Sequence, residues 1–123
     1  MKTLLLVACA AVCFNSCLCA ADPARAETTF KKLLAAQTAK DYDAFVADAD
    51  DVLRAALTKT QFEASSNLMS TRFAGGYEST YLGDLNQKGY EVYLYRLRFK
   101  DGSDDMLAPL SLKDGKVGGI FFR

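Results

Sequence analysis

The residues of this sequence that could do acid–base chemistry are two carboxylates and a group of tyrosines in its second half. Glu78 and Asp84 flank Tyr81, and Tyr93 and Tyr95 follow in the next apolar segment. A carboxylate acts as a general base when an apolar pocket raises its pKa toward neutrality, and a tyrosine hydroxyl can stabilise the developing oxyanion. This combination would suit a reaction that begins with proton abstraction.

The local context of the acids favours binding without catalysis. Asp84 lies between Gly83 and Asn86, a setting typical of a turn carboxylate. We therefore expect Asp84 and Glu78 to be exposed, and we assign no catalytic residue. Three tyrosines and one arginine are the predicted ligand-binding residues, with ordinary core or rim packing as the alternative for the tyrosines. These residues are Tyr77, Tyr81, Tyr95 and Arg96.

Arg96 and Arg98 fall on the same face of one predicted strand, because side chains two residues apart share a face. Two guanidinium groups so placed could clamp a small anion or a peptide carboxylate. The alternative is ion pairing across the sheet with Glu78 or Asp105, since exposed sheet faces commonly mix charges of both signs.

The sequence lacks the residues that nucleophilic catalysis, metal binding and phosphate binding commonly use. The chain has no histidine, and its four cysteines all lie within the first 19 residues. Serine–histidine catalysis is therefore not supported. Asp101, Asp104 and Asp105 surround Gly102, but the twelve-residue calcium pattern ending in glutamate is missing. No glycine-rich phosphate-binding motif is present, so the sequence predicts neither a metal nor a cofactor.

The first 21 residues have the pattern of a bacterial-type export signal. Lys2 precedes an apolar run from Leu4 to Phe14, and small residues follow up to Ala21. This run is shorter than the roughly 20 residues that span a bilayer, so we expect no transmembrane anchor. Cleavage before Asp22 would release the domain into the periplasm or the medium.

Such cleavage would also remove every cysteine, so we predict no disulfide in the mature domain. The four are Cys9, Cys13, Cys17 and Cys19. The alternative is lipoprotein processing, in which Cys17 becomes the lipidated first residue after Phe14-Asn15-Ser16. Lipidation would hold the protein at a membrane surface.

The mature chain, 22–123, has 102 residues once the first 21 of 123 are removed, a length typical of one domain. Basic and acidic residues number 15 each, and loss of Lys2 leaves 14 against 15. A nucleic-acid surface normally shows a basic excess or stripe. We therefore expect no nucleic-acid partner.

Hydrophobic periodicity is helical up to residue 75 and alternating afterwards, which predicts an α+β fold. Asp22, Asp41 and either Asp50 or Asp51 are candidate N-caps for three helices, the first running to about Lys40. Thr58 and Gln61 fit the capping box of a fourth, which Gly75 and Gly76 end. Its apolar face consists of Phe62, Ser66, Met69 and Phe73.

Four strands in an antiparallel meander are expected after Gly76, joined by glycine-containing turns at 88–89, 101–102 and 114–115. In the second strand Tyr93, Tyr95, Leu97 and Phe99 share the face predicted to pack on the helices. Pro109 lacks a backbone donor, so we expect it at an edge or a bulge. The predicted strands are Tyr77 to Leu85, Tyr90 to Lys100, Asp105 to Leu112 and Lys116 to Phe122.

With Gly76-Tyr77 opening the first strand and Asp114-Gly115-Lys116-Val117 turning into the last, the segment from about 25 to 123 resembles the nuclear transport factor 2-like (cystatin-like) superfamily. The resemblance is to its small exported bacterial domains of unknown function. It implies N-terminal helices on a curved, cone-like sheet whose open end forms a cavity. Enzymes and binding proteins of the superfamily both use this cavity, so the fold does not choose between them.

Three functional hypotheses follow. The favoured one is an exported, non-catalytic domain that binds a small molecule or a peptide. The second is an isomerase- or dehydratase-like enzyme that uses a carboxylate and a tyrosine. The third is a structural module that forms a homodimer through the exposed sheet face around Val92 and Leu94.

Overall fold

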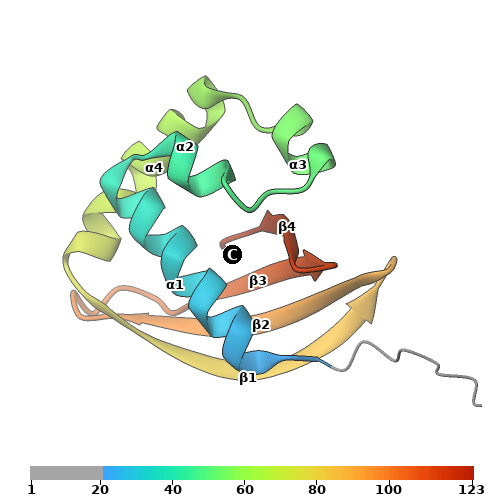
Figure 1. Ribbon diagram of the computed structural model, residues 1–123. Coiled ribbons are helices and arrows are strands. Elements are labelled where there is room, and N and C mark those ends of the chain that lie inside the picture. Colours follow the sequence, from blue (N-terminus) through green and yellow to red (C-terminus); the bar gives the residue numbers. More distant parts are fainter. Residues whose placement is uncertain (1–20) are drawn as a thin grey trace, which may run out of the picture.

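The computed structural model describes residues 21–123. All of the expected export signal except Ala21, including the four cysteines, lies outside the described residues. Four helices precede four strands along the chain (Figure 1). The elements are α1 (Pro23–Ala39), α2 (Tyr42–Val46), α3 (Asp51–Ala56), α4 (Lys59–Ala74), β1 (Tyr77–Gln87), β2 (Tyr90–Phe99), β3 (Met106–Lys113) and β4 (Lys116–Ile120).

Side-chain caps fix where the helices begin, as the sequence predicts. Asp22 Oδ1 accepts a hydrogen bond from the Arg25 backbone N–H at 3.1 Å, and Pro23 opens α1, where a missing N–H has no cost. Asp41 and Asp50 cap α2 and α3 in the same way. Thr58 and Gln61 form the reciprocal capping box of α4.

The strands form one antiparallel sheet in the order β1-β2-β3-β4. The turns at 88–89 and 114–115 both have two residues of positive φ, the type I′ geometry that matches strand twist. The sheet curves, and α1 crosses its concave face while α2, α3 and α4 lie toward one end (Figure 1). The predicted α+β class, with N-terminal helices on a curved four-stranded antiparallel sheet, is confirmed.

The prediction for Pro109 is wrong. It lies inside β3, paired with Leu94 of β2 on one side, and the β3–β4 bulge is farther along, between Ser111 and Leu112. On its other side it faces Phe121, whose N–H donates to the Pro109 carbonyl at 3.1 Å. Because proline has no N–H, the pair of Pro109 and Phe121 lacks its second hydrogen bond. Phe121 lies just after the end of β4, where the sheet tolerates this loss.

The core lies between α1 and the aromatic face of β2. Tyr93, Tyr95, Leu97 and Phe99 are at most 3% exposed, which confirms the predicted face. The ring of Phe30 in α1 stacks on Tyr95 with centroids 4.0 Å apart. Leu33 and Phe62 are buried as predicted, and Met69 packs against the same core half-buried.

The expected dimer face around Val92 and Leu94 is not as the sequence suggested. Val92 is only 6% exposed, and Leu94 is half-buried. The exposed large side chains nearest to it in β1 and β3 are Leu82, Leu85 and Leu107. Leu85 pairs with Val92 and Leu107 pairs with Arg96, so alternation identifies the face correctly but not which of its side chains are exposed.

The loop between α2 and α3 is held against the last strand. Ala49 forms a parallel bridge with Val117, whose backbone accepts from Asp50 N at 2.8 Å and donates to the Asp48 carbonyl at 2.7 Å. The Tyr90 hydroxyl also donates to Asp50 Oδ2 at 3.0 Å. These bonds fix α3 beside β4. Among residues 21–123, no helix has the length and apolarity to cross a membrane.

A candidate ligand-binding cavity

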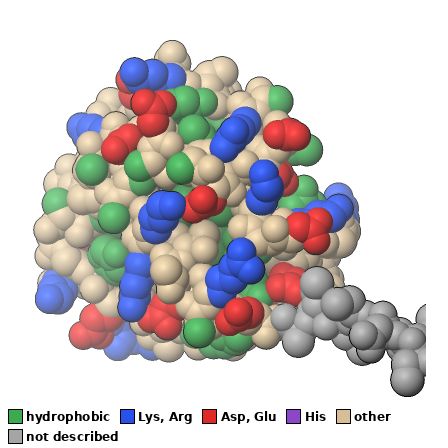
Figure 2. Space-filling view, in the orientation of Figure 1, with side chains coloured by type: hydrophobic (Ala, Val, Ile, Leu, Met, Phe, Trp, Pro, Cys, Tyr) green, Lys and Arg blue, Asp and Glu red, His purple; other side chains and the backbone are tan. Residues whose placement is uncertain are grey.

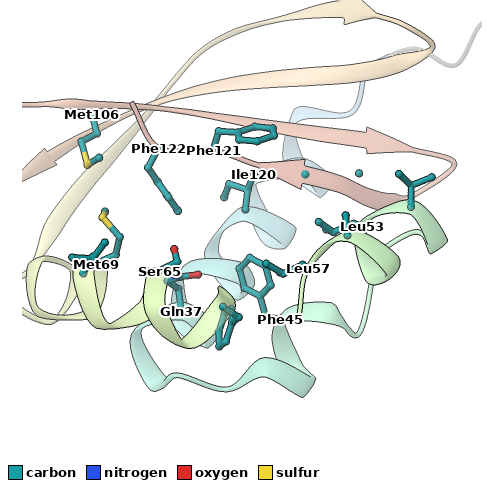
Figure 3. Close-up of a pocket in the computed structure, with 16 residues that line it drawn as sticks. Gln37, Phe45, Leu53, Leu57, Ser65, Met69, Met106, Ile120, Phe121 and Phe122 are labelled. Atoms are coloured by element: carbon teal, nitrogen blue, oxygen red, sulfur yellow. Dashed lines mark hydrogen bonds between the residues drawn. The ribbon is translucent and has the colours of Figure 1, made fainter. Parts of the chain in front are cut away.

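A cavity of about 550 Å³ lies between the helices and the C-terminal end of the sheet (Figure 3). We call it the apolar cavity. The helices, chiefly α3 and α4, form one wall, and β4 with the residues that follow it forms the other. Its lining residues are Gln37, Phe45, Val52, Leu53, Ala56, Leu57, Phe62, Ser65, Leu68, Met69, Met106, Gly118, Gly119, Ile120, Phe121 and Phe122.

Apart from Gln37 and Ser65, the lining side chains are hydrocarbon, aromatic and thioether, and none of the described residues that line the cavity is charged. Figure 3 shows Phe45, Leu53 and Leu57 on the helical side, facing Ile120, Phe121 and Phe122. Met69 and Met106 approach each other at the far end. Flexible, polarizable methionines adapt to ligands of different shape. This lining suits a mostly apolar molecule.

Gln37 and Ser65 supply the polar side chains of the lining. Gln37 in α1 is 2% exposed, and its Nε2 donates to Ser65 Oγ in α4 at 3.0 Å. No donor from the described residues reaches the Gln37 amide oxygen. It is not among the buried polar atoms that lack a partner, so this oxygen remains accessible beside the cavity and can orient one donor on a bound molecule.

The rim of the cavity is unusually apolar for a surface. Val52, Leu68 and Phe121 line it and are 69%, 77% and 55% exposed. Single exposed apolar side chains are common, whereas several around one concavity mark a binding site. A ligand seated here would cover them and gain the free energy of burying apolar surface.

Two glycines shape the sheet side of the cavity. A Cβ atom on Gly118 would overlap the ring of Tyr90, and one on Gly119 would lie 3.2 Å from the ring of Phe121. The glycines therefore let these rings close onto the strand. Gly118 and Gly119 also leave this part of the wall as bare backbone.

The four predicted ligand-binding residues lie outside this lining. Tyr77 is half-buried, with its ring edge-to-face on Phe73 at 5.6 Å. Tyr95 is 1% exposed under Phe30, and its hydroxyl has no hydrogen-bond partner among residues 21–123. Burial is the main cause that raises the pKa of Tyr95 to about 12.

Tyr81 and Arg96 make local polar contacts instead. The Tyr81 hydroxyl donates to Asp84 Oδ1 at 2.6 Å, and this bond is the main cause that raises the pKa of Tyr81 to about 12. Arg96 Nε lies 4.0 Å from Asp105, and Arg98 Nε lies 3.6 Å from the same carboxylate. The sequence offered two interpretations of these arginines, an anion clamp and ion pairing across the sheet. The geometry matches ion pairing, with Asp105 as the partner.

The two candidate acids are exposed, as the sequence predicts. Glu78 and Asp84 both face solvent, and neither lines the apolar cavity. The described residues hold no group of three or more acidic side chains placed to bind a metal. On the face seen in Figure 2, lysines and arginines alternate with aspartates and glutamates, without a large patch of one sign.

Sequence reasoning missed nearly all of the cavity. Phe62 and Met69 belong to the predicted apolar face of the fourth helix, but that pattern indicates packing and not the space left beside it. The usable signal was the run Gly118-Gly119-Ile120-Phe121-Phe122, in which three large apolar residues follow two glycines at the end of the sheet.

Comparison with known proteins yields a distant structural likeness. No family model matches the chain, and no curated protein matches it significantly. Among solved structures, it is similar to an uncharacterised cystatin-fold protein from Novosphingobium aromaticivorans. The two share 19% sequence identity, over 78% of this chain and 95% of that one, with a TM-score of 0.40. Such a likeness assigns no ligand and no activity.

Proposed function

We propose that residues 22–123 form an exported, non-catalytic domain that binds a small, uncharged and largely apolar molecule in the apolar cavity. The observation that carries this proposal is the lining itself: about 550 Å³ of space bounded by apolar side chains, with Gln37 and Ser65 as its polar ones. Pockets of this size and character hold small-molecule ligands in many proteins.

The absence of charge from the lining narrows the class of ligand. A carboxylate or phosphate moved into this cavity would lose its hydration without gaining a cation, which costs several kcal/mol. A neutral molecule loses far less. One hydroxyl or N–H group on that molecule would satisfy the free acceptor of Gln37.

The same lining argues against the isomerase-like hypothesis. That chemistry needs a carboxylate inside the cavity to take a proton. Glu78 and Asp84 lie outside it and are exposed. The tyrosines that could stabilise an oxyanion are likewise not lining residues.

The proposal extends to the superfamily and the cellular location of the domain. The order of helices and the curved meander support membership of the nuclear transport factor 2-like superfamily, in its small exported bacterial group. The export pattern of residues 1–21 supports a periplasmic or extracellular location.

Titration with N-phenyl-1-naphthylamine, an uncharged fluorescent molecule with one N–H group, tests the proposal. We expect saturable binding of one molecule per chain, with enhanced fluorescence. Ala56→Trp places a large ring at the cavity wall and should weaken binding at least tenfold. Ala55→Trp is the matched control, because Ala55 is also exposed in α3 but is not a lining residue.

Equal binding by the two tryptophan variants would place the probe elsewhere and refute the cavity assignment. No saturable binding by the unmodified chain would contradict the proposed ligand class. Circular dichroism of both variants checks that they keep the fold.

A further inference from the structure

The backbone N–H of Asp22 is bound by a side chain of the sheet. It donates to the Tyr93 hydroxyl at 2.9 Å, and that hydroxyl donates to Glu91 Oε2 at 2.6 Å. Tyr93 is 1% exposed and Glu91 is half-buried. A chain of two hydrogen bonds therefore links the start of α1 to β2.

Asp22 is also the residue expected to become the first of the mature protein. Hydrolysis of the Ala21–Asp22 peptide bond consumes one water, leaves a carboxylate on Ala21 and gives Asp22 a free amino group, which is protonated at neutral pH. The Asp22 nitrogen, which now donates one hydrogen bond, would then carry three hydrogens and a positive charge.

We propose that the Tyr93–Glu91 pair is a binding site for the amino terminus created by cleavage before Asp22. The Asp22 ammonium keeps its bond to the Tyr93 hydroxyl and gains the charge of the Glu91 carboxylate. Removal of the export signal thereby strengthens the attachment of α1 to the sheet. This inference is independent of the ligand in the apolar cavity.

The surroundings can accommodate such an ammonium group. A hollow of about 350 Å³ beside Asp22 is lined by Glu91, Tyr93 and the turn at 113–115. The Asp22 carboxylate, which caps α1, adds a second negative charge next to the amine. Hydrogen bonds between an ammonium and a carboxylate are about twice as strong as those between neutral groups.

The charged groups around this amine come from several elements. They are Asp22, which caps α1, Arg25 of α1, Asp84 of β1, whose charge acts on the Tyr93 hydroxyl, Glu91 of β2, and Lys113 and Asp114 where β3 turns into β4. The four acids outnumber the two bases and favour the protonated amine, and the positive end of the α1 dipole opposes it more weakly. The protonated amine stabilises the fold fully below the pKa of an unfolded terminus, about 7.7 to 8.0. This stabilisation is lost as pH rises through the pKa of the amine in the folded chain, which is higher.

The test compares two chains of residues 22–123, which contain all the described helices and strands. One has a free Asp22 amine and the other is acetylated there. At pH 6 we expect acetylation to lower the thermal midpoint by about 4 °C or more, and the difference to disappear at pH 10. Glu91→Gln should reduce the difference at least by half, because only the Asp22 carboxylate then remains next to the amine, whereas Glu63→Gln, at an exposed position on α4, should preserve it.

Equal midpoints for the two chains at pH 6, or a difference that is undiminished in Glu91→Gln, would overturn the proposal. Amine reactivity gives a second measurement without a variant. The Asp22 amine should react with an acylating reagent at least tenfold more slowly in the folded chain than in a peptide of residues 22–30. Equal rates would overturn the proposal, as would an exported protein that begins at another residue.

Discussion

The side-chain amide of Gln37 donates to the hydroxyl of Ser65 at 3.0 Å, and this bond joins α1 to α4 beside the apolar cavity. Gln37 is 2% exposed, so its amide has little access to water. A buried polar group that loses its partner costs about 1 to 3 kcal/mol, whereas replacing both partners by apolar groups can be nearly neutral. The effect of changing Gln37 on the free energy of unfolding should therefore depend on whether Ser65 is present, and the reverse.

We expect Ser65→Ala to lower the free energy of unfolding by about 1 kcal/mol, because the Gln37 amide then has no acceptor. Gln37→Leu should cost a similar amount, and the double variant should cost less than the sum. Urea denaturation of the four chains measures this coupling. Additive losses would show that the hydrogen bond contributes nothing, and Thr60→Ala, exposed on α4, serves as the control.

The ring of Phe99 packs inside the core, beside α4. It is 3% exposed, lies 6.1 Å from the ring of Phe73 and has the Arg72 guanidinium 4.0 Å above it. Phe99→Ala should therefore lower the free energy of unfolding by about 3 to 5 kcal/mol. Leu82→Ala, at a position 53% exposed, should change it by less than about 0.5 kcal/mol. A loss below about 1 kcal/mol for Phe99→Ala would contradict the assignment of the inner face.

The tyrosines of the sheet predict how stability changes at high pH. The pKa values of Tyr81, Tyr93 and Tyr95 are each raised to about 12. A hydrogen bond to Asp84 is the first cause for Tyr81, and burial is the first cause for the other two. Because the folded pKa exceeds the unfolded value of about 10, their stabilising effect is complete below pH 10 and is lost as pH rises toward 12. Thermal unfolding followed from pH 8 to 12 should show this decline.

Asp84→Asn isolates one of these groups. Without the carboxylate, the Tyr81 hydroxyl loses its charged acceptor, so its pKa should fall toward 10. Carbon NMR of the tyrosine Cζ atoms resolves each residue during titration. Tyr77, whose pKa is raised by burial and lowered by Lys31, should titrate as before, and Asp43→Asn, at an exposed position of α2, should leave Tyr81 unchanged. An unshifted Tyr81 in Asp84→Asn would show that this hydrogen bond does not form in solution.

The elements of the fold were predictable because local signals specify them. Asp22, Asp41 and Thr58 are caps whose side chains bond to backbone within three residues. The turn at 114–115 needs positive φ, which its Asp-Gly sequence provides. Alternation in β2 identified Tyr93 to Phe99 as core-facing. Each of these inferences needs only residues close in sequence.

The cavity could not be predicted in this way because it depends on long-range packing. Gln37, Leu53 and Phe122 meet only after α3 is fixed beside β4 by the bonds of Val117 to Asp48 and Asp50. Pro109 shows the same limit, since its tolerance depends on where β4 ends opposite it. The site residues expected on the tyrosine face were chosen by residue type, which says nothing about where space is left between elements.

Processing of the N-terminal segment is the last prediction. Expression of the whole chain in a bacterium should yield an exported protein whose intact mass corresponds to residues 22–123, with no disulfide, because every cysteine precedes Asp22. Ala21→Tyr should block this cleavage, since the peptidase requires a small residue there, and Ala24→Tyr, beyond the site at an exposed position, should not. Recovery of a membrane-bound form that begins at Cys17 and carries a lipid would contradict the prediction. The amine of Asp22 would then never form, and Tyr93 would bind only a peptide N–H.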